Sequence, residues 1–312
     1  MQKNSIMVSI ICNVYNHERY VREALESFVM QKTNFNYEVL VHDDASTDHS
    51  ADIIREYEKQ YPEIIKPIYQ TVNQYSKINM SITRTYQVPR AKGKYIAFCE
   101  GDDFWNDPYK LQKQFDEMEA HPEIDMCAHA AYEICGNKLV KKIMPSTVKT
   151  ILDTKSVILG DGGFFATNSL FYRTSIYKEV PEFHRVFNVD YSLQILGSLR
   201  GGVLYLPDLM STHRVGVPGS WTERVKKDKK VDMRHSERKI QSLRLLDKYT
   251  NGKYHDAIMQ KVADVGIRYL KIQHRYHDIR HGEYSEYYKQ LPFKEKYRIW
   301  AHQFLFWFGL RP

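Results

Sequence analysis

The first half of the sequence contains two consecutive segments in which a short apolar strand pattern is followed by a polar turn and a helical pattern. Residues 7–14 are a β-branched apolar run, and residues 18–30 repeat apolar side chains at helical spacing. Residues 37–42 and 49–61 repeat this order, with the polar segment DDASTD between them. Strands that alternate with helices in this way pair in parallel, so the pattern predicts a parallel sheet.

The same alternation continues to about residue 120. Residues 64–70 and 94–100 are predicted strands, and residues 81–91 form a predicted helix between them. A further helix is expected after Asp107, with Pro108 at its first helical position. The first 120 residues are therefore predicted to be α/β.

After Pro122 the apolar runs become shorter. The segments IDMCAHAAYEI and NKLVKKIM predict an antiparallel hairpin, and NSLFYR and VLYLP predict two more strands, with a helix from about Asp190 between them. From Thr222 onward, apolar residues recur every three or four positions among many charges, which predicts a helical tail. The expected breaks in this tail are at Gly252, Gly282 and Pro292.

The charge of the chain is unevenly distributed. Of the 312 residues, the segment 223–312 carries 21 Lys and Arg against 11 Asp and Glu, whereas residues 1–222 are slightly acidic. A basic segment with Trp and Phe suits nucleic acid, anionic lipid or an acidic substrate, and charge alone does not choose among them. The composition, with 43% hydrophobic and 27% charged residues, excludes disordered and collagen-like chains.

The cysteines and the apolar runs indicate the cellular compartment of the protein. The four cysteines form no Cys-x-x-Cys pair, so we expect reduced thiols and neither a zinc cage nor a disulfide framework. No run approaches the 18 or so apolar residues of a membrane span, and the first residues lack a leader pattern. We therefore expect a cytoplasmic protein.

Polar side chains follow each predicted parallel strand. In a parallel α/β sheet, ligands bind beyond the carboxyl ends of the strands, so these side chains are expected to converge on one edge. Asp48 is interpreted as a helix cap, because aspartate in such a turn usually caps the next helix. The residues that follow the three strands are Asn13, Tyr15 and Asn16, then Asp43 and Asp44, and then Glu100, Gly101, Asp102 and Asp103.

The last of these groups indicates a metal. Three carboxylates within the four residues from Glu100 to Asp103 repel one another unless a cation or hydrogen-bond donors compensate them. Oxygen ligands favour Mg²⁺ or Mn²⁺, which proteins commonly bind through one or two carboxylates and the oxygens of a diphosphate. A solvated acidic turn is the alternative.

Three segments together resemble glycosyltransferase family 2, a family of inverting enzymes with the GT-A fold. They read VSIICNVYNHERYVREALES, YEVLVHDDASTDHSADI and GKYIAFCEGDDFWNDPYKLQKQ. The resemblance continues more weakly to residue 222. It implies a Rossmann-like, mostly parallel sheet with a small antiparallel part, in a catalytic domain at 1–222. The nucleotide-sugar part would be 1–120 and the acceptor part 121–222, followed by the basic helical region 223–312.

The resemblance also implies roles for the donor-side residues. Tyr15 would stack on the base, with Asn13 beside it, and Asp44 would accept a hydrogen bond from the base edge. Asp102 and Asp103 occupy the Asp-x-Asp region of the family, where one contacts the ribose and one the divalent metal, Mn²⁺ or Mg²⁺; which one holds the metal stays open. Arg84 falls where relatives often place an arginine that reaches the nucleotide, with an exposed helix arginine as the alternative.

The second part of the chain supplies the remaining expected residues. Asp190 is the expected general base for the acceptor hydroxyl, with an N-cap aspartate as the alternative. Arg214 is expected at the phosphates, and Asn168 and Trp221 in the acceptor region. The sequence departs from the family pattern because His213 replaces a tyrosine and Gly216 stands where a metal-contacting histidine is often found. We therefore expect the metal to be held by one aspartate, the diphosphate and water.

The expected activity is transfer of a sugar from a nucleoside diphosphate, mainly UDP, to a saccharide or lipid-linked saccharide in surface polysaccharide biosynthesis. Two alternatives stay open: a catalytically silent nucleotide-sugar binder, and a nucleic-acid-binding protein that acts through the basic tail. The segment IWAHQFLFWF has the composition of an interfacial helix, so we consider peripheral contact with the inner face of the membrane. Packing of this segment on the catalytic domain or on a second subunit in a homo-oligomer is the other interpretation.

Overall fold

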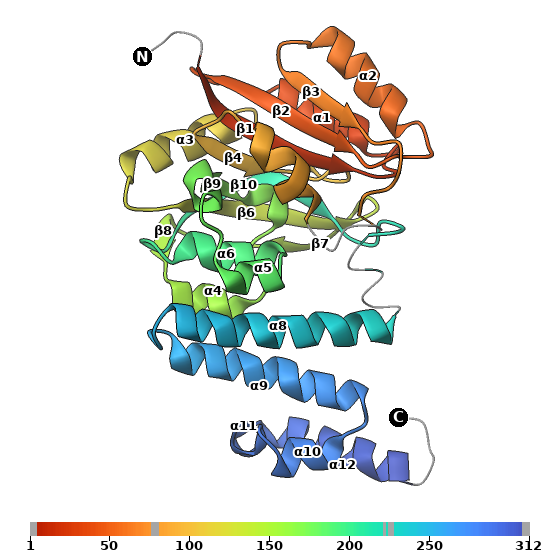
Figure 1. Ribbon diagram of the computed structural model, residues 1–312, viewed down its shortest axis with the longest axis vertical. Helices are drawn as coiled ribbons and strands as arrows, with labels where there is room; N and C mark the ends of the chain where they lie inside the picture. Colours follow the sequence, from red (N-terminus) through yellow and green to blue (C-terminus); the bar gives the residue numbers. More distant parts are fainter. Residues whose placement is uncertain (1–4, 76–80, 221–222, 224–227, 308–312) are drawn as a thin grey trace. The chain divides into compact units, whose positions relative to one another are not determined.

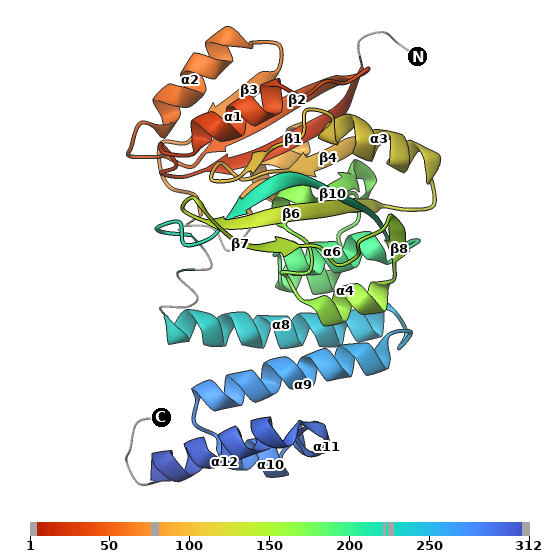
Figure 2. The same cartoon turned by 180° about the vertical axis from the view of Figure 1, so that it is seen from behind.

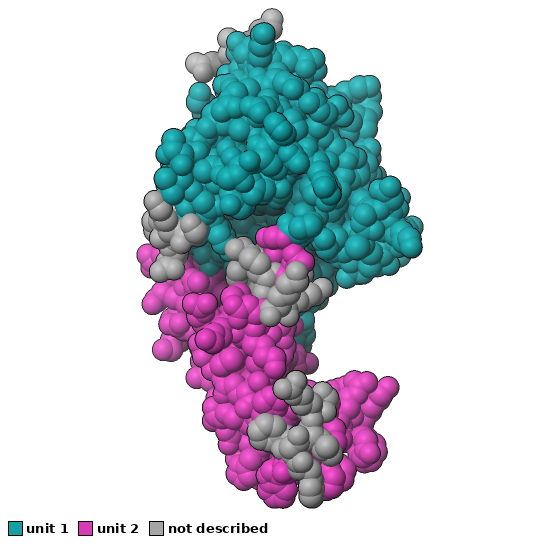
Figure 3. Space-filling model, turned by 90° about the vertical axis from the view of Figure 1, so that its right-hand side faces the viewer, with its two compact units in different colours: residues 1–180, 188–218 teal, residues 181–187, 219–312 magenta. Residues whose placement is uncertain are grey.

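The computed structural model describes residues 5–75, 81–220, 223 and 228–307. The chain divides into two compact units, coloured separately in Figure 3. Unit 1 comprises residues 1–180 and 188–218, and unit 2 comprises residues 181–187 and 219–312. Trp221, expected in the acceptor region, lies outside the described residues.

Unit 1 is built on one mixed sheet, in which the described residues form ten strands (Figures 1 and 2). The strand order is β3-β2-β1-β4-β9-β6-β10-β5, with β7 beside β6 and β8 beside β10. The first four strands in this order are parallel, as the sequence predicts. They are β1 (Ile6–Val14), β2 (Asn36–Asp43), β3 (Ile65–Tyr69) and β4 (Tyr95–Phe98).

The antiparallel part lies beyond β4. The strand β9 pairs antiparallel with both β4 and β6, while β10 runs parallel to β6 and antiparallel to β5 and β8. The predicted hairpin is confirmed, since β6 and β7 pair antiparallel. These strands are β5 (Phe104–Trp105), β6 (Met126–Cys135), β7 (Lys138–Ile143), β8 (Thr150–Leu152), β9 (Phe171–Arg173) and β10 (Val203–Arg214).

The helices of unit 1 follow the predicted alternation with two local differences. The predicted helix at 81–91 is a π-turn followed by a 3₁₀ turn, because Pro89 has no N–H to continue an α-helical ladder. The helix after Pro108 begins at Lys110, because the Asp107 side chain accepts the Tyr109 N–H and holds a turn there. The elements are α1 (Val21–Val29), α2 (Ser50–Gln60), η1 (Thr83–Gln87), η2 (Val88–Arg90), α3 (Lys110–Ala120), α4 (Thr154–Gly160), η3 (Thr167–Ser169), η4 (Thr174–Tyr177) and α6 (Asp190–Ser198).

The main core lies between the parallel strands and the helices α1, α2 and α3. Buried apolar side chains from β1 and β2 pack there with Leu25, Phe28, Ile54 and Leu111 of the helices. The strand β1 is buried on both faces, since Ile11 as well as Ile10 is inaccessible to solvent, as expected for a central parallel strand.

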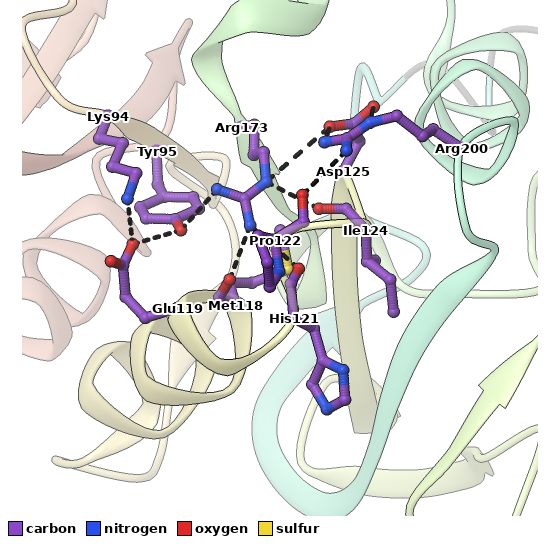
Figure 4. A network of polar contacts seen from close by, with 10 residues as sticks. All are labelled: Lys94, Tyr95, Met118, Glu119, His121, Pro122, Ile124, Asp125, Arg173 and Arg200. Atoms are coloured by element: carbon purple, nitrogen blue, oxygen red, sulfur yellow. Dashed lines mark hydrogen bonds and ion pairs between the residues drawn. The ribbon is translucent and has the colours of Figure 1, made fainter.

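Arg173, at the end of β9, lies beside Tyr95, the first residue of β4, and Figure 4 shows its network of polar contacts. Its guanidinium donates to the carbonyl oxygens of Met118, His121 and Ile124 and to the hydroxyl of Tyr95. Two of these carbonyls lie at the C-terminal end of α3, where helix carbonyls lack partners within the helix. Arg173 therefore ties α3 to β4 and β9.

Unit 2 is helical, as predicted for the tail. Its helices are α5 (Glu182–Val186), α8 (Lys229–Tyr249), α9 (His255–Ile272), α10 (Tyr276–His281), α11 (Ser285–Gln290) and α12 (Phe293–Trp307). The segment 181–187 joins these helices because the Ser242 hydroxyl donates to the carbonyl of Phe183, at 2.8 Å. The expected breaks at Gly252, Gly282 and Pro292 all lie between helices, and one unexpected break occurs at His274, whose φ is 59°.

Candidate active site

The loops that follow β1 and β2 hold each other at the carboxyl edge of the sheet. The Asn16 side-chain oxygen accepts the Thr47 N–H at 2.8 Å, and the Ser46 hydroxyl accepts the Asn16 N–H at 3.0 Å. Asn16 has a φ of 57°, a conformation that asparagine tolerates better than most residues. Asp48 accepts the N–H of Ser50, the first residue of α2, at 3.0 Å, but the cap position of this helix is His49, so the interpretation of Asp48 as the cap residue is wrong by one position.

Asp44 directly follows β2 and is almost fully buried. Its two carboxylate oxygens accept the backbone N–H groups of Gln74 and Tyr75, at 2.7 and 3.0 Å. The neighbouring Asp43 has one oxygen that is buried without a partner among the described residues, and burial raises the pKa of this carboxyl. Asp44 thus fixes the loop after β3, and each of its oxygens retains a lone pair for another donor.

The ends of β1 and β4 are joined through Asn13 and Glu100. The Asn13 backbone N–H donates to one Glu100 oxygen at 3.2 Å, and its side-chain amide donates to the other at 3.3 Å. The same amide donates to the Thr83 hydroxyl of η1 at 3.0 Å, next to the half-buried Arg84. Burial, together with the charges of Asp190 and Asp102, raises the pKa of Glu100 to about 8.

Asp103 connects the acidic segment to β10. One of its oxygens accepts the Arg214 backbone N–H at 2.8 Å, and the other lies 3.0 Å from Nδ1 of His213. Burial alone lowers the pKa of His213, but the charge and hydrogen bond of Asp103 and the charge of Asp102 outweigh it and raise this pKa to about 9. His213 is therefore a cation at neutral pH that donates to Asp103.

The Arg214 side chain is also held within the protein. Its guanidinium donates to the carbonyl oxygen of Asp102 at 2.6 Å and forms an ion pair with Glu23 of α1. It lies over the rings of Phe104 and Tyr20, at 4.6 and 5.1 Å from their centroids. In this structure Arg214 fixes the turn that carries Asp102, and its contact with phosphates stays a prediction.

Asp190 is the first residue of α6, and the cap position of this helix is Val189. The carboxylate accepts a 2.5 Å hydrogen bond from the Thr167 hydroxyl and makes no side-chain cap bond within the described part of α6. Asp190 is exposed to solvent, yet the protein around its carboxylate removes part of its water and raises the pKa of this group. The charge of Asp190 contributes to the raised pKa of Glu100.

The acidic segment suits a divalent cation that completes its shell with ligand oxygens. Within the residues that the structure describes, no side chain hydrogen-bonds to the half-buried carboxylate of Asp102, whereas both oxygens of Asp103 are engaged. Burial and the charge of Asp103 raise the pKa of Asp102, which means that the ionised carboxylate is destabilised at this position. A bound cation would relieve this destabilisation. The same described residues contain no cluster of three ligating side chains, so a metal here would need oxygens from a substrate and water.

The remaining predicted residues differ in exposure. Tyr15 follows β1 and is 44% exposed. Asn168 is fully buried, donates to the Thr212 carbonyl at 2.8 Å and accepts from the Ser211 hydroxyl at 2.7 Å. Its amide therefore holds β10 in place beside His213, and its acceptor role stays a prediction.

Sequence reasoning missed Glu23, Thr83 and Thr167. Each of them contacts a predicted site residue that is distant in the sequence: Arg214, Asn13 and Asp190, respectively. Glu23 and Thr83 lie on α1 and η1, and Thr167 lies on η3, where no local pattern marks them. Only the folded structure identifies these contacts.

Comparison with known proteins supplies the family. The model of the family described as Glycosyl transferase family 2 matches residues 9–180, more than half of the chain. An uncharacterised protein of Mycobacterium tuberculosis is 34% identical over 216 residues, which is 69% of this chain and 60% of that protein. The chain thus spans less than two thirds of the length of this relative. A putative teichuronic acid biosynthesis glycosyltransferase of Bacillus subtilis is 34% identical over 36% of this chain and 42% of its own length.

Solved structures show the same fold at low identity. A segment of S. aureus TarS in complex with UDP-GlcNAc matches with a TM-score of 0.61 and 16% identity, covering 93% of this chain and 78% of that one. The mannosyltransferase PcManGT from Pyrobaculum calidifontis, in complex with GDP-Man and Mn²⁺, matches with a TM-score of 0.53 and 14% identity, over 85% of this chain and 74% of that one. The expected GT-A fold is confirmed. The chain belongs to glycosyl transferase family 2.

Proposed function

We propose that this protein is an inverting glycosyltransferase that moves a sugar from a UDP-sugar to a saccharide or lipid-linked saccharide of a surface polysaccharide. The observation that carries the proposal is a chain of contacts that leads from Asp190 to the acidic segment, although β6 and β9 separate the two in the chain. Asp190 accepts from Thr167, the adjacent Asn168 donates to the β10 carbonyl of Thr212, and the next residue, His213, lies 3.0 Å from Asp103. The UDP-GlcNAc bound to TarS and the teichuronic acid role named for the Bacillus relative support this choice of donor and pathway class.

The donor nucleotide would lie over the ends of β1 and β2. The exposed ring of Tyr15 is available to stack on a base, and Asn13 lies two residues before it at the end of the same strand. Asp44 is held by two backbone N–H groups, so its free lone pairs are fixed in direction for a donor on the base edge. Arg84 and Arg214 flank this region on η1 and β10 and are proposed to face the nucleotide.

The metal, Mn²⁺ or Mg²⁺, would be held by Asp102. Asp103 would act as a positioning residue, because its two oxygens orient His213 and the backbone of Arg214. A bound cation neutralises the charge that develops on the departing diphosphate. His213, which lies 3.0 Å from Asp103, would add a second positive charge to this segment when it is protonated.

Asp190 would be the general base. In an inverting transfer the acceptor oxygen attacks the anomeric carbon, its proton passes to the base, and the diphosphate leaves with the electrons of the broken bond. The raised pKa of Asp190 makes its carboxylate a better proton acceptor at neutral pH, and the hydrogen bond from Thr167 fixes its orientation.

The test compares Asp190→Asn, Asp102→Asn and, as a matched control, Asp208→Asn, which removes an exposed partner of Lys113. With UDP-sugar, Mn²⁺ and a panel of saccharide acceptors, UDP release should fall by about 10²–10⁴-fold in Asp190→Asn. Titration calorimetry should show unchanged UDP binding in this variant and weaker Mn²⁺-dependent binding in Asp102→Asn.

Full turnover by Asp190→Asn would remove that residue from the mechanism. Donor binding by the wild type without turnover on any acceptor would favour the catalytically silent binder, and failure to bind any nucleotide would overturn the proposal.

A further inference from the structure

The helix α12 presents a continuous stripe of aromatic side chains to solvent. Phe293, Tyr297, Trp300, Phe304 and Trp307 are 83%, 57%, 49%, 48% and 80% exposed, respectively. Their spacing of four, three, four and three residues places them within an arc of about 80° around the helix, at 3.6 residues per turn. Neighbouring rings contact one another, with centroids 6.0 Å apart between Tyr297 and Trp300 and 5.7 Å apart between Trp300 and Phe304. We call these five residues the aromatic stripe.

Residues away from the aromatic stripe pack α12 against the other helices of unit 2. Ile299 is 1% exposed, and His302 contacts the ring of Tyr276 in α10. Glu295 lies away from the stripe and pairs with Arg298 at 2.8 Å and with Lys271 of α9 at 3.8 Å. The aromatic stripe is therefore additional to the face that stabilises unit 2. Contiguous exposed apolar surface of this kind marks an interaction site.

The charges on α12 favour an anionic occupant. The helix carries three cations, Lys294, Lys296 and Arg298, against the single acid Glu295. At helical spacing, Lys294 and Lys296 fall on the two flanks of the stripe, whereas Glu295 falls on the far side and pairs there with Arg298. Lys296 donates to the carbonyl oxygen of Lys289, so Lys294 is the flanking cation on which the test below depends. The segment 223–312 as a whole has ten more basic than acidic residues. A second copy of the chain would bring two basic flanks together in a symmetric dimer, which is unfavourable.

Aromatic residues flanked by lysine suit the interface of a membrane. Trp and Tyr are enriched there because their rings are apolar and their edges are polar, and lysine attracts anionic headgroups. No helix within the described residues is long and apolar enough to cross a bilayer, so α12 would lie in the plane of the interface. We propose that α12 docks on an anionic lipid surface through the aromatic stripe. This docking is independent of whether the chain transfers sugars.

The test is flotation of the full chain with vesicles of phosphatidylcholine alone and of phosphatidylcholine mixed with phosphatidylglycerol. The stripe variant carries Trp300→Ser, Phe304→Ser and Trp307→Ser. The matched control carries Leu139→Ser, Val148→Ser and Ile151→Ser, which remove three exposed apolar side chains of unit 1. Circular dichroism and thermal melting establish that both variants keep the fold.

The wild type and the control should float with the mixed vesicles and far less with phosphatidylcholine alone. The partition coefficient of the stripe variant should fall about tenfold for each aromatic side chain removed. Brominated lipids should quench tryptophan fluorescence of the wild type, and Lys294→Glu should weaken binding to the mixed vesicles only.

Three results would overturn the proposal: no flotation of the wild type, equal flotation of the stripe variant, or equal binding to both kinds of vesicle. A dimer that sedimentation detects and the stripe variant dissociates, without flotation, would instead assign the stripe to a second copy of the chain.

Discussion

Lys110 is a lysine inside the core of unit 1, and it makes a testable contribution to stability. Its side chain is inaccessible to solvent, with Nζ donating to Gln114 at 2.7 Å and lying 3.9 Å from the centroid of the Trp105 ring. One hydrogen bond and one ring replace the water that a lysine ammonium normally binds, so burial lowers the pKa of Lys110 to about 7.

The sign of the pH dependence follows from linkage. In the unfolded chain the pKa of Lys110 returns to about 10.5, so between about pH 7 and 10.5 the unfolded state binds a proton that the folded state does not. The free energy of unfolding of the wild type therefore rises with pH through this window, and the cost of the buried charge is fully present below it. The two pKa values give a gain of about 3 kcal/mol between about pH 6.5 and 9.5.

The variant Lys110→Met removes this dependence. The free energy of unfolding of Lys110→Met minus that of the wild type should fall by about 3 kcal/mol as the pH rises from about 6.5 to 9.5, because only the wild type gains stability over this range. Urea unfolding followed by circular dichroism at several pH values measures this difference. Burial is the largest cause of the pKa shifts of Cys99, Cys127 and His129, and it keeps these groups neutral in the fold of both proteins, so they add nearly the same pH slope to each.

The matched control is Lys113→Met, on the same helix. Its hydrogen bonds to Asp107 and Asp208 raise the pKa of Lys113, so this lysine is charged in both states over the same pH range. Its removal should leave the pH slope unchanged. Parallel curves for Lys110→Met and the wild type would refute the conclusion that Lys110 loses its proton in the fold near pH 7.

Two further predictions concern stability, each with a matched control. Arg173→Leu should lower the free energy of unfolding by about 3–5 kcal/mol, because it removes a cation that is only 11% exposed together with its hydrogen-bond donors, whereas Arg200→Leu, at a half-exposed ion pair, should cost at most about 1 kcal/mol. Gly93→Ala should cost about 3 kcal/mol or more, because its Cβ would lie 2.5 Å from the Ser9 backbone nitrogen, whereas Gly163→Ala, with open space around it, should be near neutral. Chemical denaturation measures all four.

Much of the fold could be predicted because its signals are local. The apolar runs of β1, β2 and β4 and the helical spacing of α1 and α2 are each contained within a few residues. The parallel arrangement then follows from the alternation of strands and helices. The break at His274 was missed, because a positive φ at a residue other than glycine leaves no clear pattern in the sequence.

The candidate site was predictable only as far as topology determines it. Parallel strands bring Asn13, Asp44 and Glu100 to one edge of the sheet, and the structure places them there. The contacts between distant segments were not predictable, and two of them change how a residue is understood. The Asp190 carboxylate accepts from the Thr167 hydroxyl instead of capping its helix, and the Arg214 guanidinium forms an ion pair with Glu23.

The different environments of Asp102 and Asp103 illustrate why adjacent identical residues could not be distinguished from the sequence. The strand β5 pairs antiparallel with β10, and Phe104 lies opposite Thr212. In an antiparallel pair, the residue before Phe104 must then lie opposite the residue after Thr212, which brings Asp103 to His213. A shift of one residue would bring Asp102 there instead and leave Asp103 free of these bonds. The register of a two-residue strand therefore determines which carboxylate is fixed within the protein and which stays available to a cation.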